Sequence, residues 1–105
     1  MVYTVQDLHD KLQAGEKLTL IDVREPNEWE ICRLAGATLI PLSQFTCRAP
    51  AELDANDRIV LYCHHGRRSA QAQQFLKSHG FQNVINLAGG IDAWAIHIDP
   101  TMRRY

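Results

Sequence analysis

Apolar residues in this sequence come in short runs that alternate with longer stretches of mixed polarity. The runs are rich in Val, Ile and Leu, and they are bounded by Gly, Pro, Asn or charged residues. Short runs that are apolar at consecutive positions predict strands buried on both faces of a parallel sheet. We expect four such strands, at residues 18–23, 37–40, 58–62 and 84–87.

The stretches between these runs carry helical signals. Val5, Leu8 and Leu12 form one apolar face at helical spacing, directly after Thr4 as a capping residue. Further helical segments are expected from Pro26, along the face of Ala72, Phe75, Leu76 and His79 with Gly80 after its end, and at residues 91–96. Residues 42–57 are loosely patterned, and only one helical turn, at 51–53, is expected there before a turn at 56–57. Alternating strands and helices predict one α/β domain over residues 1–105, with a mainly parallel central sheet.

Composition and charge narrow the functional classes. With 46% hydrophobic and 22% charged residues, the chain has the balance of an ordinary globular domain. A formal net charge of −1 gives no reason to expect a nucleic-acid partner, and no apolar run is long enough to span a bilayer. Its three cysteines are odd in number and widely spaced, which argues against a disulfide framework and favours a reducing, cytoplasmic setting.

The candidate chemistry lies where the third apolar run meets the following helix. This loop consists of Cys63, His64, His65, Gly66, Arg67, Arg68 and Ser69. Gly66 allows the backbone to curl around the cysteine, so that successive N–H groups and a helix N-terminus can face its sulfur. Arg67 and Arg68 can add charge-assisted hydrogen bonds to an anionic substrate. Such an environment lowers a cysteine pKa from its free value of about 8.5 and favours the reactive thiolate. Ligands of α/β folds bind beyond the carboxyl ends of strands, where Cys63 is expected.

Three other interpretations of the loop have less support. A buried structural cysteine would leave the neighbouring arginines and histidines without a purpose. Cys63, His64 and His65 are metal-ligand types, but adjacent side chains diverge and no Cys-x-x-Cys or His-x-x-x-His spacing accompanies them. A nucleotide phosphate loop would need a Gly-Lys-Ser/Thr ending, which is absent. We therefore expect neither a metal nor another cofactor.

On these motifs the sequence resembles the rhodanese (sulfurtransferase) family. The resemblance covers nearly the whole chain, through residues 20–30 (LIDVREPNEWE), 35–41, the loop, and 87–94 (LAGGIDAW). The loop matches the family's Cys-x-x-Gly-x-Arg pattern at Cys63, Gly66 and Arg68. A three-layer fold, with the sheet flanked by helices, is implied. Phosphatases and arsenate reductases of the same fold have five residues between cysteine and arginine; here there are four, which favours a sulfur atom over a tetrahedral phosphate or arsenate.

The resemblance implies a double-displacement reaction. Cys63 would take the outer sulfur of a donor such as thiosulfate, and a thiophilic acceptor, cyanide or a thiol, would remove it from the resulting persulfide. The loop N–H groups would stabilise the persulfide, the two arginines would orient the dianionic donor, and His64 and His65 would add polarity at the rim. A small phosphatase or arsenate reductase remains the alternative enzyme, and a rhodanese-like binding module the alternative without catalysis.

Two further groups of residues bear on this interpretation. Asp22 and Arg24 close the strand at 18–23, and we expect them to lie near the loop as a structural ion pair or as hydrogen-bond partners of the backbone. The sequence of residues 30–42 and 99–105 is similar to that of rhodanese domains fused to the adenylyltransferases of molybdopterin and thiamine synthesis. This similarity suggests a sulfur-carrier protein as a partner.

Overall fold

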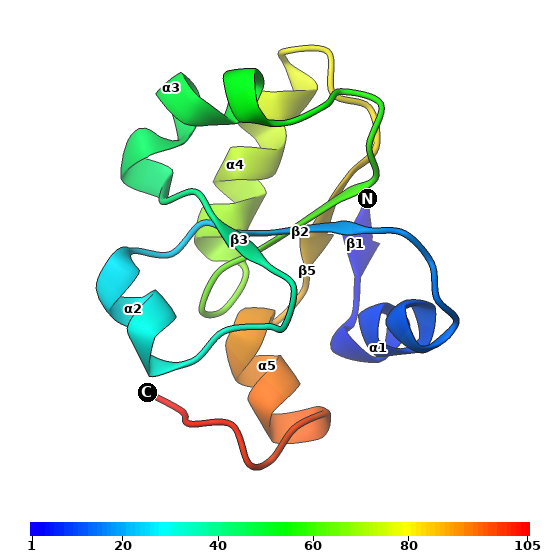
Figure 1. Ribbon diagram of the computed structural model, residues 1–105, viewed down its shortest axis with the longest axis vertical. Coiled ribbons are helices and arrows are strands. Elements are labelled where there is room, and N and C mark those ends of the chain that lie inside the picture. Colours follow the sequence, from blue (N-terminus) through cyan, green and yellow to red (C-terminus); the bar gives the residue numbers. More distant parts are fainter.

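The apolar runs form a five-stranded sheet in which every neighbouring pair of strands is parallel. The computed structural model describes residues 1–105 (Figure 1). The strands are β1 (Val2–Tyr3), β2 (Thr19–Asp22), β3 (Thr38–Leu39), β4 (Ile59–Tyr62) and β5 (Val84–Leu87), in the spatial order β1-β5-β4-β2-β3. All four residues of the central strand β4 are buried, as expected for a strand covered on both faces.

Five helices connect the strands: α1 (Val5–Gln13), α2 (Pro26–Ile31), α3 (Leu42–Glu52), α4 (Arg67–Lys77) and α5 (Gly90–His97). Phe45 of α3 and Leu76 of α4 pack in one core cluster with side chains from one face of the sheet. Leu8 of α1 and Ile91 of α5 pack in a second cluster with side chains from the other face. The predicted three-layer α/β fold is therefore confirmed (Figure 1).

The structure corrects the expectation for residues 42–57. They were predicted to hold a single turn of helix, but Leu42–Glu52 form the eleven-residue helix α3. Phe45 and Ala49, four residues apart, are both buried in the core, and this packing outweighs the weak helix formers around them. Pro50 lies in the last turn of α3, where it interrupts the helical hydrogen bonds only near their end.

Two smaller differences concern the ends of elements. Strand β1 was not predicted, because two residues are too short for a hydrophobic pattern; it pairs with β5 through Val2 and Asn86. His79 was predicted as the last residue of a one-face helical pattern, but it follows the end of α4 and is exposed, with its ring 4.2 Å from that of Phe75. None of the five helices is both long enough and apolar enough to cross a membrane.

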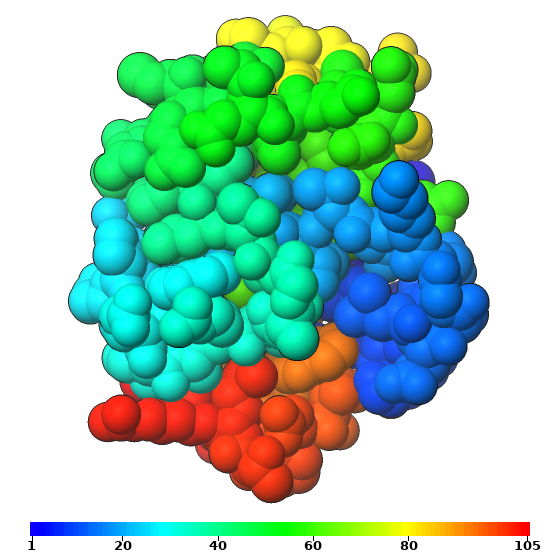
Figure 2. All heavy atoms as spheres, viewed as in Figure 1, coloured from blue at the N-terminus to red at the C-terminus, as the bar shows by residue number.

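The segment after α5 turns back along the molecule. It passes from the end of α5 toward α2, and Figure 2 shows these last residues, in red, lying beneath the α2 region in cyan. Tyr105 reaches α2 directly, because its hydroxyl donates a 2.7 Å hydrogen bond to Glu28. Two residues 77 positions apart in the sequence thus meet in the structure.

Candidate active site

Cys63 directly follows β4, the central strand, and lies at the carboxyl end of the sheet. Gly66 is the N-cap residue of α4 and has a φ of 105°, a left-handed conformation that favours glycine. This conformation turns the backbone around the sulfur, as the sequence predicted. The residue Cys63 is only 1% exposed.

Hydrogen-bond donors surround the Cys63 sulfur. The backbone N–H of Gly66 lies 3.0 Å from Sγ, and Ser69 Oγ lies 3.5 Å from it. Burial raises the pKa of the Cys63 thiol, whereas the Ser69 hydroxyl and the N–H groups of Ser69, Gly66 and His65 lower it, and the net direction is downward. The site therefore favours a thiolate mainly through neutral donors.

Backbone contacts with α5 fix the position of the loop. The carbonyl groups of Cys63 and His64 accept hydrogen bonds from the N–H groups of Ile91 and Asp92, at 2.9 and 3.1 Å. Gly90 makes this approach possible, since a Cβ atom there would lie 2.5 Å from both carbonyl oxygens. The loop is thus held against a second helix N-terminus.

Asn86 of β5 forms two hydrogen bonds with the loop and the first turn of α4. Its Nδ2 donates to the carbonyl of Gly66 at 3.1 Å, and its Oδ1 accepts from the Ser69 hydroxyl at 2.5 Å. Ser69 has one hydroxyl proton, so Asn86 and the Cys63 sulfur compete for it. A polar residue within the apolar run of β5 could have been noticed in the sequence, but the sequence does not show which loop this residue contacts.

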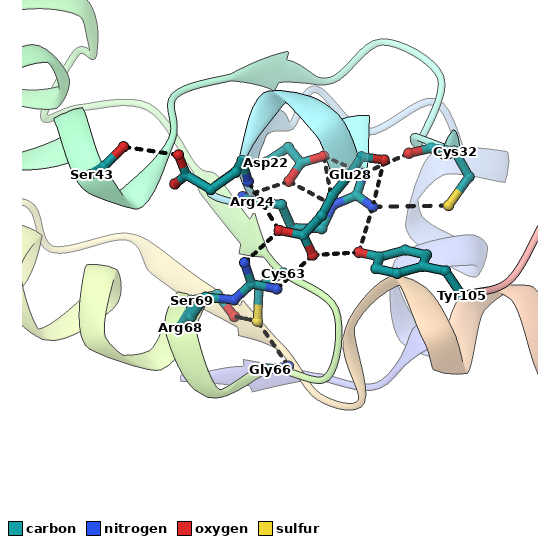
Figure 3. A network of polar contacts seen from close by, with 11 residues as sticks. Asp22, Arg24, Glu28, Cys32, Ser43, Cys63, Gly66, Arg68, Ser69 and Tyr105 are labelled. Atoms are coloured by element: carbon teal, nitrogen blue, oxygen red, sulfur yellow. Dashed lines mark hydrogen bonds and ion pairs between the residues drawn. The ribbon is translucent and has the colours of Figure 1, made fainter. Parts of the chain in front are cut away.

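Asp22 and Arg24 form a fully buried ion pair beside the loop, with 2.6 Å between Arg24 Nη2 and Asp22 Oδ2 and both side chains 0% exposed. Arg24 also donates to the carbonyl of Cys32 at 2.6 Å and to the hydroxyl of Tyr105 at 2.9 Å. The pair therefore ties β2, the end of α2 and the segment after α5 together (Figure 3).

The two loop arginines differ in their surroundings. Arg67 is exposed, whereas Arg68 reaches across to α2 and forms a bidentate pair with Glu28, at 2.6 and 2.8 Å. The hydrogen bonds from Arg68 lower the pKa of Glu28 to about 2, against a smaller opposing effect of burial. Figure 3 shows this pair next to the Cys63 sulfur. Glu28 is not among the site residues predicted from the sequence, although it lies within one of the segments that carry the family resemblance.

The histidines of the loop lie at its outer side. The ring of His64 stacks on that of Tyr105, with centroids 4.0 Å apart and an angle of 8° between the planes. Burial and the neighbouring His65 lower the pKa of His64. His65 is exposed and lies 3.9 Å from Asp92. No three His, Cys, Asp or Glu side chains of the chain converge as a metal-binding group.

Residues 4–97 match the family model described as "Rhodanese-like domain". The chain belongs to the rhodanese-like domain family. This confirms the resemblance found in the sequence, and solved structures agree with it. A rhodanese-related protein from Thermoplasma volcanium is 31% identical, with a TM-score of 0.83 and 92% of each chain covered. The human single domain sulfurtransferase TSTD1 is 27% identical, with a TM-score of 0.81, 91% of this chain and 96% of that one being covered.

Curated relatives of this rhodanese-like domain include proteins much longer than this chain and proteins of similar length. The Mycobacterium tuberculosis protein named "Probable adenylyltransferase/sulfurtransferase MoeZ" is 45% identical over 103 residues, which are 97% of this chain but 26% of that protein. The chain spans between 26% and 49% of the length of MoeZ and two other such relatives. A protein of Allochromatium vinosum named "Sulfurtransferase" is 35% identical over 92 residues, which are 88% of this chain and 85% of that one.

Proposed function

We propose that this rhodanese-like domain is a sulfurtransferase that carries a sulfane sulfur on Cys63 as a persulfide. The observation that carries the proposal is the position of Cys63 Sγ, 3.0 Å from the N–H of Gly66 in a loop with four residues before Arg68. The names of relatives that align over most of their own length support sulfur transfer as the reaction class.

The reaction begins with attack of the Cys63 thiolate on the outer sulfur of thiosulfate. A new S–S bond forms at Cys63, the S–S bond of thiosulfate breaks, and the electron pair of that bond leaves with sulfite. In the second step cyanide, or a thiolate, attacks the outer sulfur of the persulfide and releases the Cys63 thiolate. No oxidant, metal or other cofactor enters this balance.

The remaining loop residues would support both steps. The backbone donors of His65, Gly66 and Ser69 would stabilise the negative charge of the thiolate and then that of the persulfide. Arg67 is exposed and free to attract an anionic donor, and His64 with His65 would form part of the rim. Asp22 and Arg24 would hold the frame without touching the substrate.

The physiological acceptor in this proposal is a thiol or a sulfur-carrier protein. Two observations support it: MoeZ combines the names adenylyltransferase and sulfurtransferase, and a Bacillus subtilis relative, YrkF, 38% identical over 91 residues, is named as a sulfur carrier protein. A reducing compartment, which we expect to be the cytoplasm, would keep Cys63 reduced and free to react.

Intact-mass measurement after incubation with thiosulfate tests the proposal. We expect one added sulfur atom, located on the Cys63 peptide and removed by cyanide with release of thiocyanate. The Cys63→Ser variant should remain folded and gain no sulfur, whereas Cys47→Ser, at an exposed position of α3, should react like the unaltered protein. An unmodified Cys63 together with hydrolysis of an aryl phosphate would instead support the phosphatase alternative.

A further inference from the structure

The guanidinium expected to bind an anionic donor is already paired with a carboxylate. Both terminal nitrogens of Arg68 donate to the carboxylate of Glu28, at 2.6 and 2.8 Å. The same carboxylate accepts a 3.1 Å hydrogen bond from the N–H of Glu25 and a 2.7 Å hydrogen bond from the Tyr105 hydroxyl. Glu28 thus accepts four hydrogen bonds, and its side chain is only 13% exposed. Two of the five N–H donors of Arg68 are directed at Glu28, and the negative charge of this carboxylate offsets the positive charge that an anionic donor would otherwise meet.

The charges near the sulfur cancel in pairs. Arg24 is neutralised by Asp22 at 2.6 Å, and Arg68 is neutralised by Glu28 at the same distance. Arg67 is the only one of the three arginines at the site without a carboxylate partner, and it is exposed. A donor approaching the sulfur therefore meets backbone N–H groups, the solvated Arg67, and an arginine whose charge Glu28 has already offset.

Tyr105 keeps Glu28 in this position. Its hydroxyl donates to Glu28 and accepts from Arg24 at 2.9 Å, while its ring stacks on His64. Burial raises the pKa of Tyr105 to about 12, so the hydroxyl remains a neutral donor across the physiological range. Arg104, the preceding residue, is bound to Asp92 of α5 at 2.9 Å, which holds the segment in place.

We propose that Glu28 determines which sulfur donors the Cys63 site accepts, and that Tyr105 is the residue that positions it. The Glu28 carboxylate offsets the charge of Arg68 and repels an anionic donor, so each additional negative charge on the donor weakens its binding. The site then selects donors of low charge over free dianions such as thiosulfate. This inference rests on the proposed sulfur transfer and adds selectivity among donors to it.

Two donors that carry the same transferable sulfur separate charge from chemistry. Thiosulfate has two negative charges, whereas benzenethiosulfonate has one, and its attack by Cys63 releases benzenesulfinate in place of sulfite. For Glu28→Gln we expect the KM for thiosulfate to fall by roughly threefold to tenfold, with a clearly smaller change for benzenethiosulfonate and kcat within about twofold. Glu30→Gln removes the same charge from the exposed side of α2 and should change neither KM. Tyr105→Phe should shift the ratio of the two KM values in the direction of Glu28→Gln, by a smaller factor.

Alkylation of Cys63 provides a second measurement that does not require sulfur transfer. Iodoacetate is anionic and iodoacetamide is neutral, and both transfer a carbon group to the thiolate with loss of iodide. The rate with iodoacetate divided by the rate with iodoacetamide, measured at the Cys63 peptide, should rise by roughly threefold in Glu28→Gln and stay unchanged in Glu30→Gln. If wild-type protein takes sulfur from neither donor, the proposed function is wrong, and this ratio still decides the role of Glu28.

Two results would overturn the selectivity inference. If Glu28→Gln raises the KM for both donors, Glu28 orients Arg68 for donor binding and does not repel the donor. If both the KM ratio and the alkylation ratio stay at their wild-type values, Glu28 has no influence on donor charge. An unchanged ratio in Tyr105→Phe alone would remove Tyr105 from the inference and leave Glu28.

Discussion

Asp22→Asn should be among the most destabilising single substitutions in this domain, because it removes the counter-charge of a buried arginine. The side chains of Asp22 and Arg24 are both 0% exposed. Arg24 donates to the Asp22 carboxylate from Nε at 3.0 Å and from Nη2 at 2.6 Å, and its backbone N–H donates to the same group at 2.9 Å. Asparagine keeps the shape of this acceptor and loses the charge.

The expected cost follows from leaving a guanidinium buried without its partner. Breaking a buried ion pair from one side costs about 3–5 kcal/mol, out of a total of about 5–15 kcal/mol for a domain of this size. The other oxygen acceptors of Arg24 are the carbonyls of Glu28 and Cys32 and the hydroxyl of Tyr105; all are neutral and offset only part of this cost. Since 1 kcal/mol shifts the Tm of a small domain by about 4–8 °C, the Tm should fall by at least about 12 °C.

Urea unfolding followed by tryptophan fluorescence measures the change directly. A loss of about 3 kcal/mol would move the midpoint down by about 2 M at an m-value of about 1.5 kcal/mol/M. Glu52→Gln is the matched control, because Glu52 forms an exposed ion pair with Arg48 on α3, and it should leave the midpoint unchanged. A loss below about 1 kcal/mol in Asp22→Asn would refute the assignment of this pair as the structural frame of the site.

Three further predictions follow from the site. Alkylation of Cys63 by iodoacetamide should reach half of its maximal rate at a lower pH in the folded protein than in urea, and Ser69→Ala should move that pH upward by removing a hydroxyl donor. Gly90→Ala should destabilise the domain by at least about 2 kcal/mol in urea unfolding, because its Cβ would lie 2.5 Å from the loop carbonyls at a φ of 59°. Gly15→Ala, where a Cβ meets nothing within 4 Å, should cost only the left-handed strain, about 1 kcal/mol; equal costs at the two positions would argue against the clash. The unaltered protein should be more stable to urea than Glu28→Gln, and this difference should be complete above the ordinary carboxyl pKa of 4.5 and disappear as the pH falls towards about 2. A difference that persists in acid would contradict the lowered pKa of Glu28.

The fold was largely predictable because its strands and most of its helices have local signatures. Strand β4 shows an unbroken apolar run, and Thr4 caps α1 through a 3.0 Å hydrogen bond from the N–H of Asp7. Helix α3 was not predicted over its full length because tertiary packing stabilises it: Phe45 and Ala49 are buried in the core, whereas the residues around Pro50 have weak helix propensity.

The site was predictable only as far as its chemistry is local. Cys63 and the donors around it belong to one loop of consecutive residues, so that spacing alone indicated an anion-binding turn. Arg68 and Glu28 lie 40 positions apart, and Tyr105 lies 77 positions from Glu28. No periodicity links such residues, because their meeting depends on where the strands place α2 and on the return of the segment after α5.

The separation between local and distant residues also has a chemical meaning. In the proposed reaction, backbone N–H groups would stabilise one negative charge on sulfur in both the Cys63 thiolate and its persulfide, and this task needs only the loop. Selecting among donors by their charge requires a negative group near the site that repels anionic donors. A carboxylate within the loop itself would raise the Cys63 pKa and leave less of the reactive thiolate. In the proposed selectivity, Glu28 would meet both demands, because it comes from α2 and is paired with Arg68, whose positive charge reduces its effect on the thiolate. If the proposal holds, substitutions in α2 or after α5 would change the preferred donor, while the loop that carries the sulfur stays the same.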